Sequence, residues 1–130
     1  QTCALPISMP ILTVEIVVEE TEKIAPNLAW AIADAAGAIF GSAPGQTWVR
    51  LHRLPAAHYA ENGIAPDATP RPVFVSVLKA ESPASSELAR EVAELASAIG
   101  ALCGRPADVV HIFYEPPAAG RGAFGGKLVE

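Results

Sequence analysis

PILTVEIVV, residues 10–18, decides the fold. Its β-branched residues, bounded by acidic positions, are typical of a buried strand. An alanine-rich helix is expected next, with Pro26 in its first turn and Gly41 at its end. The expected apolar face of this helix consists of Leu28, Ile32, Ala35 and Ile39.

A second strand is expected over residues 45–54, which contain TWVRLHRL. Strand side chains alternate between the two faces of a sheet. One face is therefore predicted to carry Trp48, Arg50 and His52, and the other Val49, Leu51 and Arg53. Residues 55–71 contain three prolines and an Asn-Gly pair, which indicates a loop.

The same order of elements returns in the second half of the chain. We expect a strand over residues 72–79, a helix over 83–102 and a strand over 108–115. Ser82 is a favourable N-cap for this helix, and Gly104 ends it. The expected apolar stripe of the helix consists of Leu88, Val92, Leu95, Ile99 and Leu102.

A constant offset of 62 residues aligns the two halves, which indicates repeats over about 10–64 and 72–126. The aligned positions include Pro10 and Pro72, Glu19 and Glu81, Pro44 and Pro106, and Gly63 and Gly125. Each repeat joins parallel strands through a right-handed crossover, so both helices are expected on one face of a four-stranded sheet. The predicted fold is α+β (βαβ-βαβ) in a single domain, 9–130. The alternative is an α+β sandwich without internal duplication.

The composition favours a soluble, globular protein. Hydrophobic residues make up 51% of the 130 residues and charged residues 18%, which is enough apolar material for a core. The net charge is −5 and no basic run is present, so nucleic acid is not an expected partner. No stretch has the roughly 18 to 20 uninterrupted apolar residues that span a bilayer, so no membrane association is expected. Cys3 and Cys103 match neither a metal site nor a disulfide framework, which favours a cytoplasmic location.

The segment Gln1–Ser8 reads QTCALPIS and lacks the features of a secretory signal. It resembles the translation of a common sequencing adapter, and Met9 follows at once. We therefore expect a non-native extension upstream of a natural start at Met9. The alternative is a genuine N-terminal arm. If the natural chain begins at Met9, Pro10 would be the first residue of the mature chain, because methionine is usually removed before a small second residue.

Pro10, at the start of a hydrophobic strand, is the sharpest chemical feature of the sequence. The motifs of serine hydrolases, P-loop proteins, zinc proteases and dinucleotide-binding proteins are missing. An N-terminal proline carries a secondary amine, and burial disfavours the charged form of that amine. Such a group can act as a general base near neutral pH. Taken by itself, a proline at the start of a strand is more often structural.

Three stretches carry a resemblance to a known family: MPILTVEIV at 9–17, TWVRLHRLPAAHY at 47–59 and DVVHIFYEPPAAGRGAFGGKL at 108–128. The chain resembles the tautomerase superfamily, in particular members with two fused βαβ units that are related to 4-oxalocrotonate tautomerase and macrophage migration inhibitory factor. The resemblance implies an isomerase without a cofactor or metal. Such a tautomerase moves a proton between carbon and oxygen of a small 2-hydroxy-2-enoate or 2-keto acid. It also implies a homotrimer with active sites near the subunit boundaries.

The resemblance assigns roles to particular residues. Pro10 and Arg50 are the expected catalytic residues: the proline amine moves the proton, and the arginine polarises the carbonyl. The expected substrate-binding residues are Tyr59, His111, Arg121 and Phe124. Each has a structural alternative. Arg50 and Arg121 could be solvated, His111 could be satisfied within the sheet, and Phe124 could serve packing.

Several departures from the family pattern keep other functions open. The arginine that single-unit members carry after the first strand is Glu20 here, and Ser82 in the second repeat, which argues against a dicarboxylic substrate. Gln46 and Ala123 stand where related decarboxylases and dehalogenases carry a carboxylate, and Glu115 matches a common non-catalytic glutamate. The alternatives are a hydratase, dehalogenase or decarboxylase on the same fold, and a non-catalytic oligomeric binding protein.

Overall fold

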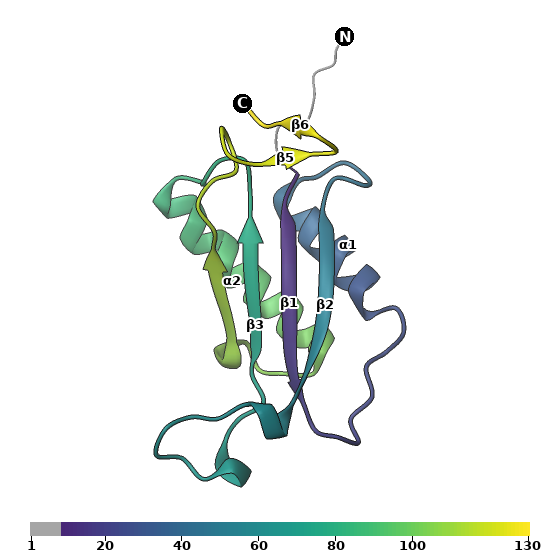
Figure 1. The fold of residues 1–130 in the computed structure, drawn as a ribbon, viewed down its shortest axis with the longest axis vertical. Coiled ribbons are helices and arrows are strands. Elements are labelled where there is room, and N and C mark those ends of the chain that lie inside the picture. Colours follow the sequence, from purple (N-terminus) through teal and green to yellow (C-terminus); the bar gives the residue numbers. More distant parts are fainter. Residues whose placement is uncertain (1–8) are drawn as a thin grey trace.

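The computed structural model describes residues 9–130, and the predicted extension Gln1–Ser8 lies outside the described residues. Figure 1 shows an elongated molecule in which two helices lie behind a sheet. The main elements are β1 (Ile11–Val18), α1 (Leu28–Phe40), β2 (Trp48–Pro55), β3 (Val73–Leu78), α2 (Ser85–Cys103), β4 (Val110–Tyr114), β5 (Ala123–Phe124) and β6 (Lys127–Leu128). Short 3-10 turns occupy Ala56–His58, Pro66–Ala68 and Ala107–Val109.

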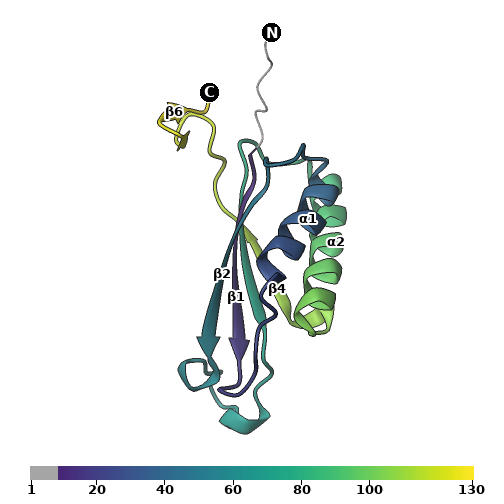
Figure 2. The same cartoon turned by 90° about the vertical axis from the view of Figure 1, so that its right-hand side faces the viewer.

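The four long strands form one sheet in the order β2-β1-β3-β4. β1 pairs in parallel with β2, and β3 pairs in parallel with β4. β1 and β3 run antiparallel at the centre of the sheet. Both helices cover the same face, as Figure 2 shows edge-on. The predicted βαβ-βαβ architecture is thus confirmed.

The core lies between this sheet face and the two helices. Alternation sends every second residue of β1 and β3 into it, as their β-branched composition predicts. The buried side chains here include Leu12, Val14, Ile16, Val73, Val75, Val77, Ile32, Leu95 and Ile99. The remaining strand residues point away from the helices, and we call this side of the sheet the open face. It carries Trp48, Arg50 and His52, as predicted from the alternation in β2.

The helix boundaries differ from the sequence prediction at their starts. α1 begins at Leu28, so Pro26 precedes it, and Ala36 is buried where Ala35 was expected. α2 begins at Ser85 after Ala84, and no side chain caps it, so the prediction of Ser82 as N-cap is wrong. The reason is tertiary: the backbone of residues 79–80 still accepts hydrogen bonds from residues 118–119, which prolongs the extended chain. Leu102, expected in the apolar stripe, is exposed.

The helix ends and strand faces of the two units correspond at an offset of 63 residues rather than the predicted 62. Gly41 and Gly104 end the two helices in the left-handed conformation, with the same pair of backbone hydrogen bonds. The faces of the strands require the same odd offset. An offset of 62 would match Leu12, which lies in the core, to Phe74, which lies on the open face. Matching prolines and glycines along the sequence therefore misplaced the repeat by one residue.

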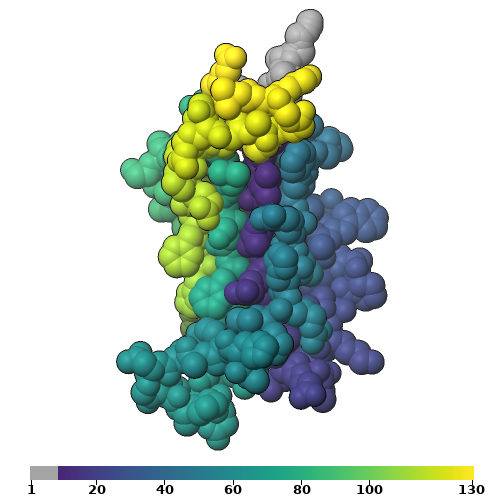
Figure 3. Space-filling view, viewed as in Figure 1, coloured from purple at the N-terminus to yellow at the C-terminus, as the bar shows by residue number. Residues whose placement is uncertain are grey.

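The C-terminal segment crosses one end of the open face. β5 and β6 form a two-stranded antiparallel hairpin there, which the sequence analysis did not predict. Figure 3 shows this segment, in yellow, over the ends of the central strands. No helix within residues 9–130 is long and apolar enough to cross a membrane.

Candidate functional site

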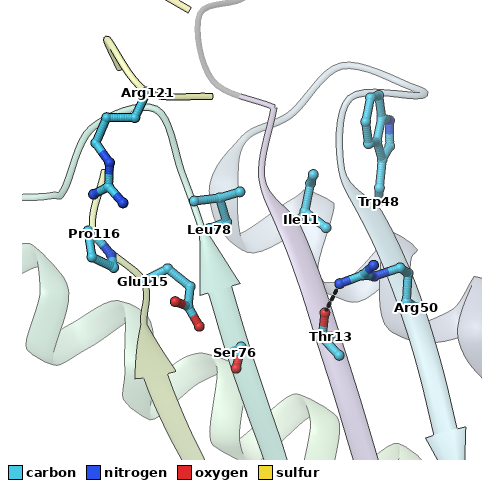
Figure 4. Close-up of a pocket in the computed structure, with 9 residues that line it drawn as sticks. All are labelled: Ile11, Thr13, Trp48, Arg50, Ser76, Leu78, Glu115, Pro116 and Arg121. Atoms are coloured by element: carbon cyan, nitrogen blue, oxygen red, sulfur yellow. Dashed lines mark hydrogen bonds between the residues drawn. The ribbon is translucent and has the colours of Figure 1, made fainter. Parts of the chain in front are cut away.

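A hollow of about 730 Å³ opens on the open face, at the end of the sheet that the C-terminal segment crosses. We call it the open-face hollow. Figure 4 shows its side chains, which come from β1, β2, β3 and the segment that follows β4. They are Ile11, Thr13, Trp48, Arg50, Ser76, Leu78, Glu115, Pro116 and Arg121.

The floor of the hollow is built by the antiparallel pairing of β1 with β3. In this register Ile11 lies opposite Leu78, and Thr13 lies opposite Ser76. Two hydroxyl groups thus follow two aliphatic side chains along the centre of the sheet. This floor is rigid because both strands are central and their alternate residues are buried in the core.

Arg50 extends over this floor from β2. It lies beside Thr13 in the parallel register, and its Nη2 donates a hydrogen bond of 2.8 Å to Thr13 Oγ1. Figure 4 shows the guanidinium directed from β2 toward Thr13 on β1, at the edge of the hollow. The hydroxyl of Thr13 therefore positions the guanidinium and leaves its other N–H groups for a ligand.

The opposite wall consists of Glu115 and Arg121. The backbone N–H of Glu115 donates to Val77 O at 2.8 Å, which continues the pairing of β4 with β3. The loop after it is held by the N–H groups of Ala118 and Ala119, which donate to Lys79 O and Ala80 O. The N–H of Arg121 donates to Ala118 O at 2.8 Å. Both charged side chains are thus carried by anchored backbone.

Phe124 lies next to the hollow rather than in its lining. Its ring lies 5.7 Å from that of Trp48, at an interplanar angle of 56°. Trp48 in turn lines the hollow, and its Nε1 donates to Gly45 O at 2.9 Å. The contact joins the C-terminal hairpin to the start of β2 and supports one wall of the hollow.

Pro10 directly precedes Ile11, which lines the hollow. The side chain of Pro10 is buried. Its carbonyl accepts a hydrogen bond of 2.9 Å from the N–H of Trp48, so the start of β1 is fixed against the start of β2. The structure thus brings four predicted residues to one end of the sheet: Pro10, Arg50, Arg121 and Phe124.

Tyr59 and His111 lie apart from the hollow. Both rings lie against Phe74, at centroid distances of 5.9 Å for Tyr59 and 5.5 Å for His111. Phe74 is near the start of β3, at the opposite end of the open face. The Tyr59 hydroxyl donates to Glu61 Oε2 at 2.6 Å, and this hydrogen bond raises the pKa of Tyr59. Tyr59 and His111 thus form an aromatic cluster with Phe74, away from the open-face hollow.

Sequence reasoning did not include Thr13, Ser76 and Glu115 among the site residues. A signal was present for two of them, because Thr13 and Ser76 are polar residues inside strongly apolar strands. Polar side chains at alternate positions of a strand indicate a solvated or functional face. Glu115 gave no such signal, because only the tertiary structure brings the end of β4 opposite Arg50.

The lining suits a small organic anion. Two guanidinium groups face the hollow, and the hydroxyl groups and one carboxylate add further polar contacts around an apolar floor. Small-molecule sites commonly combine an apolar lining with a few placed polar groups. Within residues 9–130, no group of three or more His, Cys, Asp or Glu side chains is arranged to hold a metal ion.

Solved structures with this architecture support the fold assignment. Pt0534 inactivated by 2-oxo-3-pentynoate has a TM-score of 0.71 and 21% identity, over 92% of this chain and 95% of that chain. A fused 4-OT, described as a symmetric trimer, has a TM-score of 0.71 and 18% identity, over 92% and 94%. This chain has the fold of the tautomerase superfamily. The macrophage migration inhibitory factor of Toxoplasma gondii shares it, with a TM-score of 0.68 and 16% identity over 91% and 98%.

Similarity within the tautomerase fold is structural rather than close in sequence. No protein-family model matches the chain, and no curated protein matches it by sequence. The tautomerase fold therefore accounts for the arrangement of strands and helices, while the chemistry has to be argued from the open-face hollow.

Proposed function

We propose that this protein is a tautomerase that transfers a proton between carbon and oxygen of a small 2-hydroxy-2-enoate or 2-keto acid. The observation that carries the proposal is the position of Pro10, fixed at the start of β1 directly before a residue that lines a hollow with two guanidinium groups. The hollow offers a place for a carboxylate beside a candidate base. The tautomerase fold of the structural neighbours supports the same reaction class.

The general base is the secondary amine that Pro10 has when it is the first residue. Within a peptide bond the proline nitrogen is an amide and cannot take a proton at neutral pH. As a terminal amine in a buried position, it would have a pKa below the usual range, because burial disfavours its charged form. The active form therefore begins at Pro10. It takes the proton from the enol oxygen and returns it to carbon.

Arg50 holds the carboxylate and carbonyl oxygens of the substrate. As the amine removes the enol proton, negative charge grows on this oxygen, and a fixed guanidinium stabilises it. Thr13 positions Arg50 through its hydrogen bond, and the apolar floor accepts the carbon chain. The proton carrier is part of the protein chain, so the reaction needs no cofactor.

The active assembly is a homotrimer in this proposal. One sheet face has no helices over it and exposes large apolar side chains, including Phe113 at 64% and Trp48 at 39%. A sheet face of this kind is covered most simply by another subunit. The fused 4-OT neighbours are described as trimers. Sedimentation of the purified protein would test this part of the proposal.

The decisive experiment compares a form that begins at Pro10 with the 130-residue form. Ketonisation of 2-hydroxymuconate and phenylenolpyruvate is followed by ultraviolet absorbance. General bases contribute about 10² to 10⁴ in rate, so activity should be lower by that factor when Pro10 is an amide. Equal activity of both forms would exclude Pro10 as the base. Inactivity of both, with folded protein, would favour the binding-protein or hydrolytic alternatives.

Covalent labelling gives a readout that is independent of turnover. A secondary amine adds to the electron-poor alkyne of 2-oxo-3-pentynoate, the reagent named with Pt0534. The form that begins at Pro10 should gain the mass of one reagent molecule on its N-terminal peptide. The 130-residue form, treated in parallel, should leave the peptide containing Pro10 unmodified.

A further inference from the structure

We infer that Glu115 restricts the open-face hollow to acids with a single carboxylate and an uncharged far end. The inference names the substrate class within the proposed function and rests on it. It starts from a charged group whose role the sequence left undefined: a carboxylate that faces two guanidinium groups in the same hollow.

The charged groups are distributed unevenly across the hollow. Arg50 approaches from the β2 side, while Glu115 and Arg121 occupy the β4 side. The carboxylate of Glu115 lies on the Arg121 side of the floor residue Ser76. Arg50 is therefore the cation best placed to receive a substrate carboxylate without a neighbouring negative charge.

The carboxylate of Glu115 forms no ion pair within the described residues. Among residues 9–130 the ion pairs join Arg71 with Glu19, Lys79 with Glu91, Arg90 with Glu94, and Arg105 with Glu22. Neither Glu115 nor Arg121 takes part in one of them. Two cations and one anion leave a single net positive charge in the hollow, which one carboxylate neutralises.

A second carboxylate at the far end of the substrate would lie next to Glu115. Two like charges about 6 Å apart, at an effective dielectric constant of about 40, repel each other enough to weaken binding roughly tenfold. An uncharged end instead can accept a hydrogen bond from Arg121 or lie against Leu78 and Pro116. Glu115 is thus a specificity-determining residue rather than the proton carrier.

Binding by the 130-residue chain tests the inference without turnover. Crotonate and fumarate share a trans four-carbon frame and differ in the second carboxylate. Calorimetric titration should show crotonate bound more tightly than fumarate, and Glu115→Gln should reduce this preference about tenfold. Glu87→Gln removes the same charge from α2, on the other side of the sheet, and should leave the preference unchanged. An unchanged preference in Glu115→Gln, or no binding of either acid, would overturn the inference.

Kinetics separate the inference from the proposed function. In the form that begins at Pro10, Glu115→Gln should lower the ratio of kcat/KM for phenylenolpyruvate over 2-hydroxymuconate about tenfold. Ketonisation with an unaltered ratio would retain the tautomerase and reject the role of Glu115. Absent ketonisation with an altered crotonate preference would retain the role of Glu115 and reject the tautomerase.

Discussion

The two βαβ units have the same pairing of strands, but only the first carries the candidate catalytic residues Pro10 and Arg50. Ile11 pairs with Trp48 in the first unit, and Val73 pairs with Val110 in the second, so both units separate paired residues by 37 positions. With the structural offset of 63, Arg50 corresponds to Phe113. Pro10 corresponds to a buried valine in β3. Duplication of the fold therefore did not duplicate the site, because a few open-face positions decide the chemistry.

The helix ends of the two units also differ: the residue after the terminal glycine makes more side-chain hydrogen bonds in the second unit than in the first. Ser42 and Arg105 follow the terminal glycines at equivalent positions, and the N–H of each donates to a helix carbonyl at 2.8 Å. Ser42 then makes one side-chain hydrogen bond, with Thr47. Arg105 makes five, to Val17 O, Glu22 Oε1 and Oε2, Arg71 O and Cys103 O. The first unit thus contains the candidate catalytic residues, and the helix end of the second unit makes more side-chain hydrogen bonds.

The largest expected effect concerns Arg50, which corresponds to Phe113 in the second unit. Arg50→Ala should lower kcat by about 10² to 10³, the usual loss when one donor to a developing oxyanion is removed. Steady-state ketonisation by the form that begins at Pro10 measures it. Arg53→Ala removes the same charge from the other face of β2 and serves as the matched control. A loss of less than threefold in Arg50→Ala would show that the difference between the units is not catalytic.

The helix ends provide the next comparison. Arg105→Ala should lower the free energy of unfolding by about 3 kcal/mol, because Glu22 and three carbonyl groups lose a largely buried partner. Ser42→Ala should cost about 1 kcal/mol, the usual value of one hydrogen bond. Urea unfolding followed by circular dichroism measures both. Equal losses would mean that the two helix ends contribute alike.

Glycines inside the two helices should respond with opposite signs. A Cβ at Gly100 would lie 2.7 Å from Arg105 O, so Gly100→Ala should destabilise by about 1 to 3 kcal/mol. At Gly37 the nearest atom is Thr47 Oγ1 at 3.8 Å, and Gly37→Ala should stabilise by about 0.5 to 1 kcal/mol through helix propensity. Thermal melting of both variants decides this, and shifts of the same sign would contradict the comparison.

The last effect is a pH dependence of the ion pair between Arg105 and Glu22. The hydrogen bond from Arg105 lowers the pKa of Glu22. A lowered pKa in the folded state means that the stabilisation is present above the unfolded-state value of about 4.3 and is lost as the pH falls through the folded-state value. The difference in unfolding free energy between wild type and Glu22→Gln, about 1 kcal/mol at pH 7, should shrink toward pH 3. A constant difference across this range would contradict it.

Local patterns predicted much of the fold and part of the site. The alternation in β2 placed Arg50 on the face opposite the core, because the two-residue period of a strand is a local property. Terminal glycines predicted both helix ends for a similar reason. Ser82 failed as a helix cap because residues 79–80 pair with the chain near Ala118, a contact that no local pattern contains.

The sequence by itself determined the order of elements, the apolar faces and the presence of Pro10 at the start of a strand, since these depend on neighbouring residues. Only the tertiary structure decided that Thr13 lies opposite Ser76 and that Glu115 and Arg121 face Arg50. These relations depend on the register of antiparallel strands and on the path of the C-terminal loop. Both are set by long-range contacts: Thr13 and Ser76 are 63 positions apart in the chain, and Ala118 and Lys79 are 39 apart.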